Sequence, residues 1–352
     1  MNTKIQEEID TPIYRVKEAI KEIKKGNMVI MLDDEDRENE GDLVYCATLS
    51  DDQKVNFMVT EARGLVCVSV SKDTANRLDL NPMVPHNTSS YETAFTVSVD
   101  ATDALTGISA GERDDTIQIL ANPLSKTTEL VRPGHIFPLI AKDGGVLERT
   151  GHTEGSVDLC KLAGFHGEAV ICEIMKKDGT MARRDDLDIF ATEHNLKMVY
   201  ISDIIEYRLA HETLVHEVSS SKLTFMGKDA IKQEFEDHQG LVHTAIIYGE
   251  IDPDKEINIK FHNIENDIDL LMNDRLDILT TSIKYTQENG GVIIFLSSNK
   301  LDDKNSKDFG IGAQILNILG IKHINLLTSN KKNHFFIGLN GFGLNIVDEI
   351  VL

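Results

Sequence analysis

Short apolar runs alternate with amphipathic segments along most of this chain, and polar or glycine-containing turns separate them. In the first half, five of these runs have the length and the β-branched content of strands. A longer segment spaces its apolar side chains as a helix does and is followed by Gly26, a residue type that commonly ends helices. We therefore predict a helix at 13–25 and strands at 28–32, 43–49, 65–70, 95–99 and 169–174.

A second alternating pattern occupies the C-terminal part of the chain. It follows a segment with helical spacing between about residues 205 and 222, which contains EYRLAHETLVHEV and then the polar run SSSK. Short polar runs of this kind often mark domain boundaries. The pattern predicts two α/β or α+β domains with a boundary near 206–222. Further strands are predicted at 243–250, 257–263, 290–298, 323–329 and 335–343.

Composition and charge narrow the class of protein. The chain has 352 residues, of which 41% are hydrophobic and 27% charged, as in ordinary globular proteins that form a core. It shows neither an apolar run of membrane-spanning length nor a leader-like start, so we expect a cytoplasmic protein. The formal net charge of −22 argues against non-specific binding of nucleic acids or acidic membranes.

The four cysteines are dispersed, and each lies in an apolar segment. No two of them have the CxxC spacing that is typical of zinc sites and redox motifs. We therefore expect buried free thiols, without disulfides, at Cys46, Cys67, Cys160 and Cys172.

The stretch LDDEDRENEGD, residues 32–42, holds seven carboxylates among eleven residues and lies between two predicted strands. A charge run is most often a solvated loop. A calcium loop is excluded because Ala47 stands at the twelfth position, where such loops need a bidentate glutamate. The remaining alternative is a site for Mg²⁺ and substrate, in which one or two carboxylates bind the metal and Arg37 binds a phosphate or a neighbouring acid.

Two further polar clusters interrupt the apolar pattern. Residues 106–116, TGISAGERDDT, could hold a phosphate through hydroxyl and backbone N–H groups, although the bare pattern is a weak signal. Residues 132–139, RPGHIFPL, place His135 after a rigid Pro-Gly turn. A lone histidine in a turn is most often a surface or capping residue.

A predicted turn at 148–159, ERTGHTEGSVDL, leads into a helix. A helix start with Arg149, His152 and Thr153 beside it is a suitable anion site. Glu173 lies in the otherwise apolar strand AVICEIM. A carboxylate there either faces solvent or has a raised pKa and a proton to transfer, and the pattern alone does not separate these alternatives.

Four segments together resemble the 3,4-dihydroxy-2-butanone-4-phosphate synthase family of riboflavin biosynthesis: LDDEDRENEGD, RPGHIFPL, GGVLERTGHTEGSVDLCKLAGF and DGTMAR. They occur in order within about residues 10–208. Thr150 stands where the family commonly has glycine and Gly155 where it commonly has alanine, and neither departure removes a reactive group. The resemblance implies a synthase-type α/β sandwich domain at 1–208, followed by a linker at 209–222.

The resemblance also implies a reaction and a site. The reaction converts D-ribulose 5-phosphate to 3,4-dihydroxy-2-butanone 4-phosphate and formate, with Mg²⁺, or Mn²⁺ as an alternative, in a homodimer with sites near the subunit interface. The metal ligands would be Glu38 and His152, and the acid–base groups His135 and Glu173. Asp33, Asp34 and Glu40 would share this work without a rank. The substrate would contact Arg37, Glu38, Asp42, Arg149, Thr150, Gly151, His152, Thr153 and Glu173.

The last part of the chain, at 308–330 and 338–347, resembles the C-terminal part of GTP cyclohydrolase II. That family has three zinc-binding cysteines and a nucleotide-binding loop, and the loop is missing here. The cysteine positions fall on Glu265, Leu276 and Ile278. Because thiolates are needed for this zinc site, the resemblance implies a domain at 223–352 without zinc or cyclohydrolase activity.

Two classes of function remain for the whole chain. The first is an Mg²⁺-dependent lyase whose second domain is a retained scaffold, a support for a dimer or, with less weight, a divergent ligand-binding domain. The alternative is a non-catalytic regulatory or binding protein built on two riboflavin-pathway folds. The complete set of reactive residues in the first domain favours the enzyme.

Overall fold

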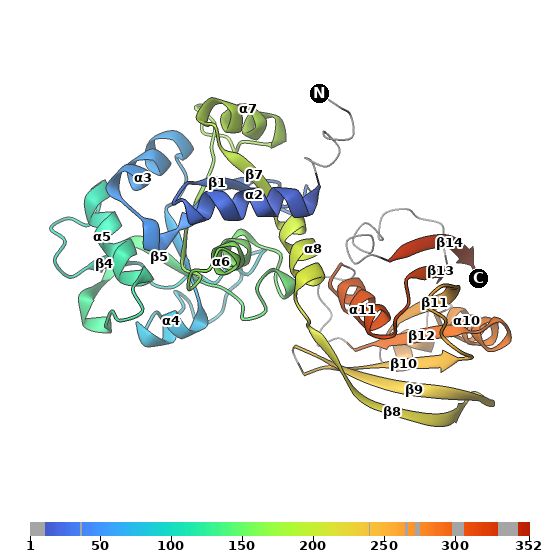
Figure 1. The fold of residues 1–352 in the computed structure, drawn as a ribbon. Coiled ribbons are helices and arrows are strands. Elements are labelled where there is room, and N and C mark those ends of the chain that lie inside the picture. Colours follow the sequence, from blue (N-terminus) through green and yellow to red (C-terminus); the bar gives the residue numbers. More distant parts are fainter. Residues whose placement is uncertain are drawn as a thin grey trace. The chain divides into compact units, whose positions relative to one another are not determined.

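The computed structural model describes residues 11–35, 37–238, 240–264, 267–271, 275–297, 306–329 and 344–352. The chain divides into two compact units, Met1–Tyr207 and Arg208–Leu352 (Figure 1). Each unit contains a seven-stranded sheet of mixed direction with helices against it, which confirms the predicted α+β class. Among the residues that the structure describes, no helix is both long enough and apolar enough to cross a membrane.

The N-terminal sheet has the strand order β4-β5-β3-β6-β2-β1-β7. The pairs β1–β7 and β3–β5 are parallel, and the other neighbours are antiparallel. The central strands are buried on both sides, so they read as continuous apolar runs. The strands are β1 Val29–Leu32, β2 Gly41–Cys46, β3 Cys67–Val70, β4 Val99–Ala101, β5 Leu130–Ile140, β6 Ala169–Glu173 and β7 Lys197–Tyr200.

Helices cover both faces of this sheet (Figure 1). On one face α6 crosses β1, β2, β3 and β6, and α2 packs beside it. On the other face α3, α4, α5 and α7 share the main apolar core with the strands. The bounds are α2 Pro12–Lys24, α3 Asp52–Phe57, α4 Lys72–Arg77, α5 Ala110–Ala121, α6 His152–Leu162, α7 Arg184–His194 and α8 Ile201–His211, with short turns η1 Ala47–Leu49, η2 Met58–Ala62, η3 Thr127–Glu129 and η4 Gly145–Leu147.

The predicted helix at 13–25 is confirmed as α2. Thr11 caps its start, because the threonine hydroxyl accepts the backbone N–H of Tyr14, and Pro12 occupies the first helical position. Gly26 follows with φ +80°, the left-handed conformation that glycine adopts without strain. All four cysteines are buried and free, as the sequence predicted.

Three predicted strands of the first half are confirmed to within two residues as β1, β3 and β6. The prediction at 43–49 is too long, since residues 47–49 form a 3₁₀ turn. The prediction at 95–99 is wrong for most of its length, because β4 begins at Val99. His135 does not follow a free turn but lies within β5, in a bulge that the β4 ladder skips between Val131 and Ile136.

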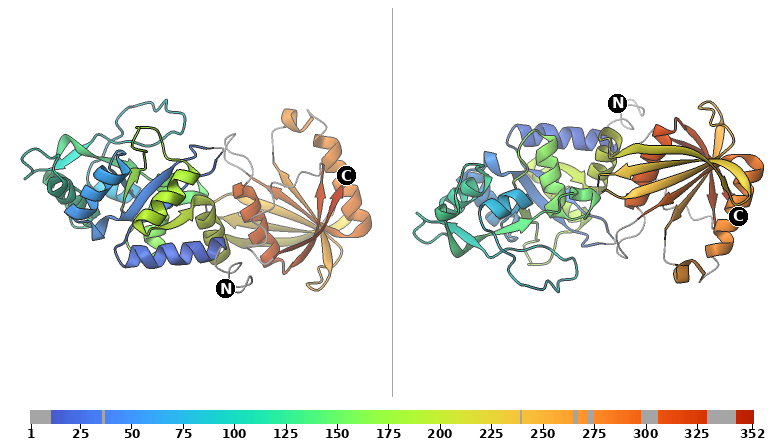
Figure 2. Two further views of the ribbon diagram at one scale, coloured as in Figure 1. Left: turned by 90° about the horizontal axis from the view of Figure 1, so that it is seen from above. Right: turned by 90° about the horizontal axis from the view of Figure 1, so that it is seen from below.

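The C-terminal sheet has the order β14-β13-β11-β12-β10-β9-β8, and Figure 2 shows its strands twisted relative to one another, as is usual for open sheets. Helix α10 packs on the face that carries Ile246 and Ile293. The bounds are β8 Val215–Phe225, β9 Lys228–Asp237, β10 Val242–Tyr248, β11 Glu256–Asn263, α9 Asp267–Leu271, α10 Arg275–Asn289, β12 Gly291–Leu296, α11 Ser306–Ile318, β13 His323–Thr328 and β14 Asn345–Val351.

The helix predicted between residues 205 and 222 is correct only as far as His211. From Val215 the chain is strand β8, which forms a hairpin with β9. The β-branched Val215 and Val218 favour a strand, and cross-strand pairing overrides the local helical spacing. Most of the expected linker, 209–222, is therefore regular structure. The strands predicted at 243–250, 257–263, 290–298 and 323–329 are confirmed, and the one at 335–343 lies outside the described residues.

Candidate active site

The acidic loop, residues 33–40, lies at one end of the N-terminal sheet. It connects β1 to β2, and the two strands pair up to the last residue before the loop, with Leu32 opposite Gly41. One residue further along β2, Asp42 stands directly opposite Glu173 of β6. The strand pairing therefore brings the acidic loop and the apolar strand's single carboxylate to the same end of the sheet.

Asp33 organises the acidic loop from its centre. Its carboxylate is buried and accepts the Arg37 guanidinium at 2.9 Å, the Glu38 backbone N–H at 3.0 Å and the Glu40 backbone N–H at 2.9 Å. These donors offset the cost of burying the charge. The repulsion among the acids is thus reduced by a folded loop, and Asp33 has a structural role that the sequence did not rank.

Three side chains in this region can hold a metal ion. Asp33, Glu38 and His152 each offer a ligand atom, and these atoms lie within 4.8 Å of one another. The distance from His152 Nδ1 to Glu38 Oε2 is 3.6 Å. Burial opposes ionisation of Glu38, but His152 and Arg37 hold its pKa at about 2. The two residues that the resemblance assigned to the metal are therefore together.

His152 and Asp42 are both buried, and each has one polar atom without a hydrogen-bond partner among the described residues, His152 Nε2 and Asp42 Oδ1. Burial raises the pKa of Asp42 to about 7, and the nearby Glu173 adds to this effect. Burial lowers the pKa of His152, but the carboxylates of Asp42 and Glu38 outweigh it and raise that pKa to about 9. A proton on this imidazole therefore neutralises part of the acid cluster.

Glu173 is half-buried at the end of β6 and accepts the backbone N–H of Leu65 at 2.8 Å. The backbone of Gly64 packs closely on it, since a Cβ there would lie 2.3 Å from the Glu173 carbonyl oxygen. Only glycine fits at this position without a shift. Glu173 is thus fixed in place beside Asp42, rather than free in solvent.

The turn before α6 contains the residues that the sequence predicted for an anion site. Gly151 is the N-cap, and no side chain caps the helix there. His152 and Thr153 form the buried first turn, while Thr150 is half-buried. Arg149 points toward other protein groups: its guanidinium donates to Glu154 at 2.5 Å, to the Tyr91 carbonyl and to the Thr93 hydroxyl.

His135 stands at the same end of the sheet but not in the metal cluster. Cys67 of β3 pairs with Phe137 on one side and with Ile171 on the other, which puts His135 and Glu173 at the same level, two strands apart. The His135 side chain is 44% exposed, and its Nδ1 lies 2.8 Å from Asp100 Oδ2.

The phosphate cradle suggested for 106–116 is occupied by the protein's own carboxylate. Glu112 accepts the backbone N–H groups of Leu105, Thr106 and Gly107 and the hydroxyls of Thr106 and Ser109. These hydrogen bonds, with Thr106 first, lower the pKa of Glu112 to about 2. The N–H and hydroxyl groups that donate to this carboxylate are therefore already engaged within the protein, which argues against a phosphate there.

Sequence reasoning missed two residues that hold the acidic loop. Arg183 donates to the backbone carbonyls of Glu38, at 2.8 Å, and of Asn39. The Tyr91 hydroxyl donates to the Arg37 carbonyl at 2.8 Å, and its ring lies under the Arg37 guanidinium. Arg183 ends the DGTMAR segment, which was a usable signal, whereas the polar loop around Tyr91 gave none.

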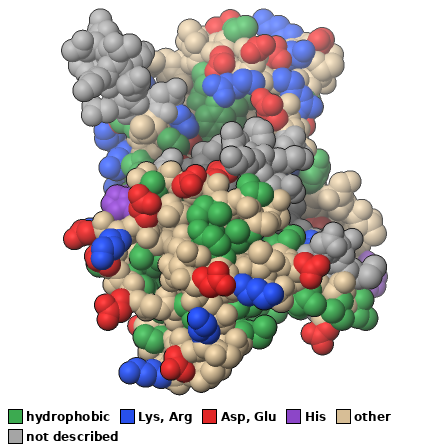
Figure 3. Space-filling view, turned by 90° about the vertical axis from the view of Figure 1, so that its right-hand side faces the viewer, with side chains coloured by type: hydrophobic (Ala, Val, Ile, Leu, Met, Phe, Trp, Pro, Cys, Tyr) green, Lys and Arg blue, Asp and Glu red, His purple; other side chains and the backbone are tan. Residues whose placement is uncertain are grey.

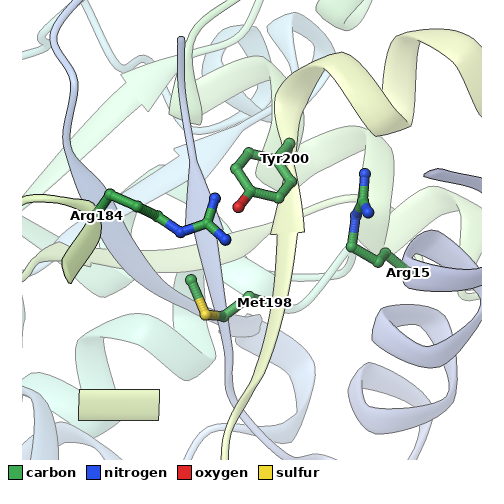
Figure 4. Close-up of a pocket in the computed structure, with 4 residues that line it drawn as sticks. All are labelled: Arg15, Arg184, Met198 and Tyr200. Atoms are coloured by element: carbon green, nitrogen blue, oxygen red, sulfur yellow. The ribbon is translucent and has the colours of Figure 1, made fainter. Parts of the chain in front are cut away.

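A pocket of about 430 Å³ lies beside the edge strand β7 and contains none of the predicted site residues. Figure 4 shows the Tyr200 ring between the guanidinium groups of Arg15 and Arg184. Arg15 is paired with Asp203, and Arg184 with Asp188. Because both cations have acidic partners, this pocket has little charge to offer a ligand.

Buried carboxylates with a histidine, next to an uncapped helix start, are typical of an enzyme site for a divalent cation and an anionic substrate. Comparisons with known proteins agree. Residues 17–207 match the model of the 3,4-dihydroxy-2-butanone 4-phosphate synthase family, and residues 299–351 match that of GTP cyclohydrolase II. A 3,4-dihydroxy-2-butanone 4-phosphate synthase of Sulfurospirillum multivorans is 56% identical, covering 95% of this chain and 94% of the relative.

Solved structures give the same picture. RibBX of A. baumannii, a two-domain 3,4-dihydroxy-2-butanone 4-phosphate synthase, matches with a TM-score of 0.83 and 38% identity over 96% of this chain and 99% of that one. Another synthase, in complex with two magnesium ions, matches with a TM-score of 0.54 and 40% identity over 56% of this chain and 97% of that one. The chain belongs to the 3,4-dihydroxy-2-butanone 4-phosphate synthase family, which confirms the resemblance and the class of enzyme.

Proposed function

We propose that the N-terminal unit converts D-ribulose 5-phosphate to 3,4-dihydroxy-2-butanone 4-phosphate and formate at the acidic end of its sheet. The observation that carries this proposal is the pair of buried atoms without a described partner, His152 Nε2 and Asp42 Oδ1. Buried polar atoms are nearly always hydrogen-bonded, so this pair marks the place of a ligand. Membership of the family supplies the reaction.

Glu38 and His152 are the proposed metal ligands, with Asp33 orienting the loop. Mg²⁺ is the proposed metal, because the donors are hard oxygens and an imidazole and because a related synthase binds magnesium. Mn²⁺ is the alternative. When bound, the cation polarises substrate oxygens and favours enolisation. The residues fit such an ion, since its charge would replace the neutralising proton of His152.

The substrate phosphate is proposed to lie against the turn from Arg149 to Thr153. The uncapped start of α6 offers backbone N–H groups, and the helix dipole favours an anion there. Arg37, within the acidic loop, donates to Glu38 Oε2, the same oxygen that His152 approaches. Asp42 would accept a substrate hydroxyl from inside the cluster.

His135 and Glu173 are the proposed acid–base groups. Enolising a ketose and expelling a hydroxyl both need groups that move protons at fixed positions. Asp100 binds Nδ1 of His135, which leaves Nε2 to exchange a proton with the substrate. Glu173 accepts the Leu65 N–H through Oε2 and is paired with Asp42 on the neighbouring strand, so both carboxylates lie at the same end of the sheet.

A homodimer is the proposed assembly. Four large apolar side chains in the segment 105–131 are exposed: Leu105 is 95% exposed, Leu124 83%, Ile108 53% and Val131 44%. Exposed apolar side chains of this kind often mark protein interfaces. The segment includes α5 and the start of β5, the strand that carries His135. On the face drawn in Figure 3, acidic and basic side chains are mixed and form no large basic patch. A cytoplasmic location stays a prediction.

The C-terminal unit is proposed to lack zinc and cyclohydrolase activity. Leu276 and Ile278 lie on helix α10 and cannot ligate a metal, and no cysteine follows Cys172. Glu265 lies outside the described residues. Metal analysis of the purified chain should find no stoichiometric zinc, and incubation with GTP should release no formate. One zinc per chain would refute this proposal.

The direct test of the synthase proposal is formate release from ribulose 5-phosphate with Mg²⁺. We expect turnover that EDTA abolishes and added Mg²⁺ restores. A matched control is Glu35→Gln, which removes an exposed acid of the same loop and should leave turnover unchanged. A pure, folded protein without formate release would instead favour the regulatory alternative.

A further inference from the structure

The bulge in β5 that carries His135 is held by side chains instead of by strand pairing. The ladder to β4 is interrupted there, so the backbone N–H groups of the bulge need other acceptors. Two side chains supply them: Ser98 Oγ accepts the N–H of Gly134 at 3.1 Å, and Asp100 Oδ1 accepts the N–H of His135 at 2.8 Å. The chain at the start of β4 therefore fixes the backbone of His135.

The Asp100 carboxylate also binds the His135 ring. Asp100 Oδ2 lies 2.8 Å from His135 Nδ1, so one buried side chain holds both the backbone and the imidazole of the same residue. Gly107 packs closely on this contact, since a Cβ there would lie 2.0 Å from Asp100 Oδ2. Nε2 has no hydrogen-bond partner among the described residues, and 44% of the His135 side chain is exposed. The ring is thus fixed at one nitrogen and available at the other.

The burial of Asp100 gives this pairing a direction. The residue is 7% exposed, and in the part of the chain that the structure describes no lysine or arginine forms an ion pair with it. A buried carboxylate needs hydrogen-bond donors, and an ionised carboxylate can only accept. Nδ1 of His135 must therefore carry a proton, and in the neutral imidazole the free lone pair then lies on Nε2.

We propose that Asp100 is a positioning residue that fixes His135 as the Nδ1–H tautomer, so that Nε2 is the atom that takes a proton from the substrate. This inference rests on the acid–base role proposed above for His135. A buried carboxylate that selects the tautomer and the orientation of an acid–base histidine is a recurring device in enzymes. Here the bulge holds the carboxylate, the backbone and the ring together as one unit.

Asp100→Asn is the decisive variant, because the orientation of the new amide is forced. The backbone N–H of His135 can only donate, so it requires the amide oxygen. The amide NH₂ group then faces Nδ1, which must become the acceptor and leave the proton on Nε2. The substitution keeps the size of the side chain but reverses the tautomer, and the available nitrogen can no longer accept a proton.

The tautomer is read in the full-length chain, labelled at the histidine ring nitrogens, by proton–nitrogen correlation NMR of the neutral imidazole. The signals of His135 are identified by their loss in His135→Gln. We expect a protonated Nδ1 in the unaltered chain and a protonated Nε2 in Asp100→Asn. Formate release from ribulose 5-phosphate with Mg²⁺ should show kcat lowered by a factor on the order of 10² or more in Asp100→Asn, with a smaller change in KM.

Two further variants separate the tautomer from the stability of the fold. Ser98→Ala removes the other side chain that holds the bulge, so it should lower Tm and keep the Nδ1–H tautomer. Asp103→Asn makes the same chemical change at an exposed acid shortly after β4 and should alter neither the tautomer nor kcat. If Asp100 were merely structural, its replacement would lower Tm and leave the tautomer and kcat unchanged.

Two results would overturn the inference. One is an unaltered chain whose neutral His135 is protonated at Nε2, a result that requires no variant to fold. The other is an Asp100→Asn chain that keeps either the Nδ1–H tautomer or the kcat of the unaltered protein. An unaltered chain that releases no formate would refute the proposed function instead, and the tautomer, which is read without substrate, would still decide whether Asp100 sets it.

Discussion

The two units have the same kind of sheet, but the charged side chains that we compare on these sheets are opposite in sign. Each has seven strands of mixed direction with helices against it, and each has a polar cluster at the strand ends. In the N-terminal unit the cluster is acidic and contains one histidine, His152. The neighbouring carboxylates raise the pKa of its imidazole to about 9 and so favour its protonated form. In the C-terminal unit, Lys260 of β11 forms no ion pair with a described carboxylate, and burial and the charges of Lys260 and Arg275 lower the pKa of the nearby His262.

Two sheets of the same kind thus carry side chains of opposite charge, so the side chains, and not the sheet, set the local electrostatics. An acidic cluster with a protonated imidazole suits a cation, because the ion can take the place of the proton. The comparison can be tested by changing one charge in the acidic cluster and measuring whether turnover with Mg²⁺ is lost.

The largest expected loss of turnover is at the proposed metal ligands. Glu38→Gln and His152→Ala should each reduce formate release by on the order of 10³, because either change removes a ligand and the charge stabilisation that the cation provides. Far-UV circular dichroism should show an intact fold, and Glu35→Gln should remain fully active. If either variant retains full activity, that residue does not bind the metal.

The next effect concerns proton transfer. His135→Ala and Glu173→Gln should lower kcat by a factor on the order of 10² or more, as expected for lost general acid–base groups, with a smaller change in KM. His166→Ala is the control, because it removes an exposed histidine elsewhere in the same unit. A change confined to KM would show that the residue positions the substrate and transfers no proton.

Sequence reasoning found the residues that lie in continuous motifs and missed those that depend on distant pairing. Glu38 and His152 were assigned by their segments, and the structure brings them together. Arg183 was not, because its partners are backbone carbonyls 145 and 144 residues away. His135 was placed in a turn because the bulge in β5 exists only through the pairing with β4.

The strand at 215–225 was missed for a related reason. Local spacing in EYRLAHETLVHEV is compatible with a helix to its end, but pairing with β9 decides the conformation from Val215 onward. The role of Asp33 also lies beyond the sequence, because three donors from its own loop converge on it only when the loop is folded.

A smaller effect on turnover is expected from Glu112→Gln. Its carboxylate holds the loop that packs on the Asp100–His135 pair, since a Cβ on Gly107 would lie 2.0 Å from Asp100 Oδ2 and 2.8 Å from His135 Nδ1. Glu112→Gln weakens these hydrogen bonds, so kcat should fall by less than tenfold.

The free energy of unfolding should depend on pH in part through the same residue, Glu112. The folded pKa of Glu112 lies below its usual value, so its contribution is present above the unfolded pKa and is lost as pH falls toward about 2. The stability difference between the unaltered chain and Glu112→Gln, measured by urea unfolding, should shrink across that acidic range. A difference independent of pH would contradict the hydrogen-bonded carboxylate.

The smallest expected effect is on turnover when the second unit is removed. Every proposed catalytic residue precedes Tyr207, the end of the first compact unit, so a chain ending at His211 should keep the kcat and KM of the full chain. Loss of about 140 residues should instead lower stability or solubility, because the carbonyl of Leu209 loses its donor Gln314 and apolar surface is exposed. Formate release, Tm and dimer mass by light scattering separate these effects. A shortened chain that is folded and dimeric yet inactive would show that the second unit contributes to synthase activity.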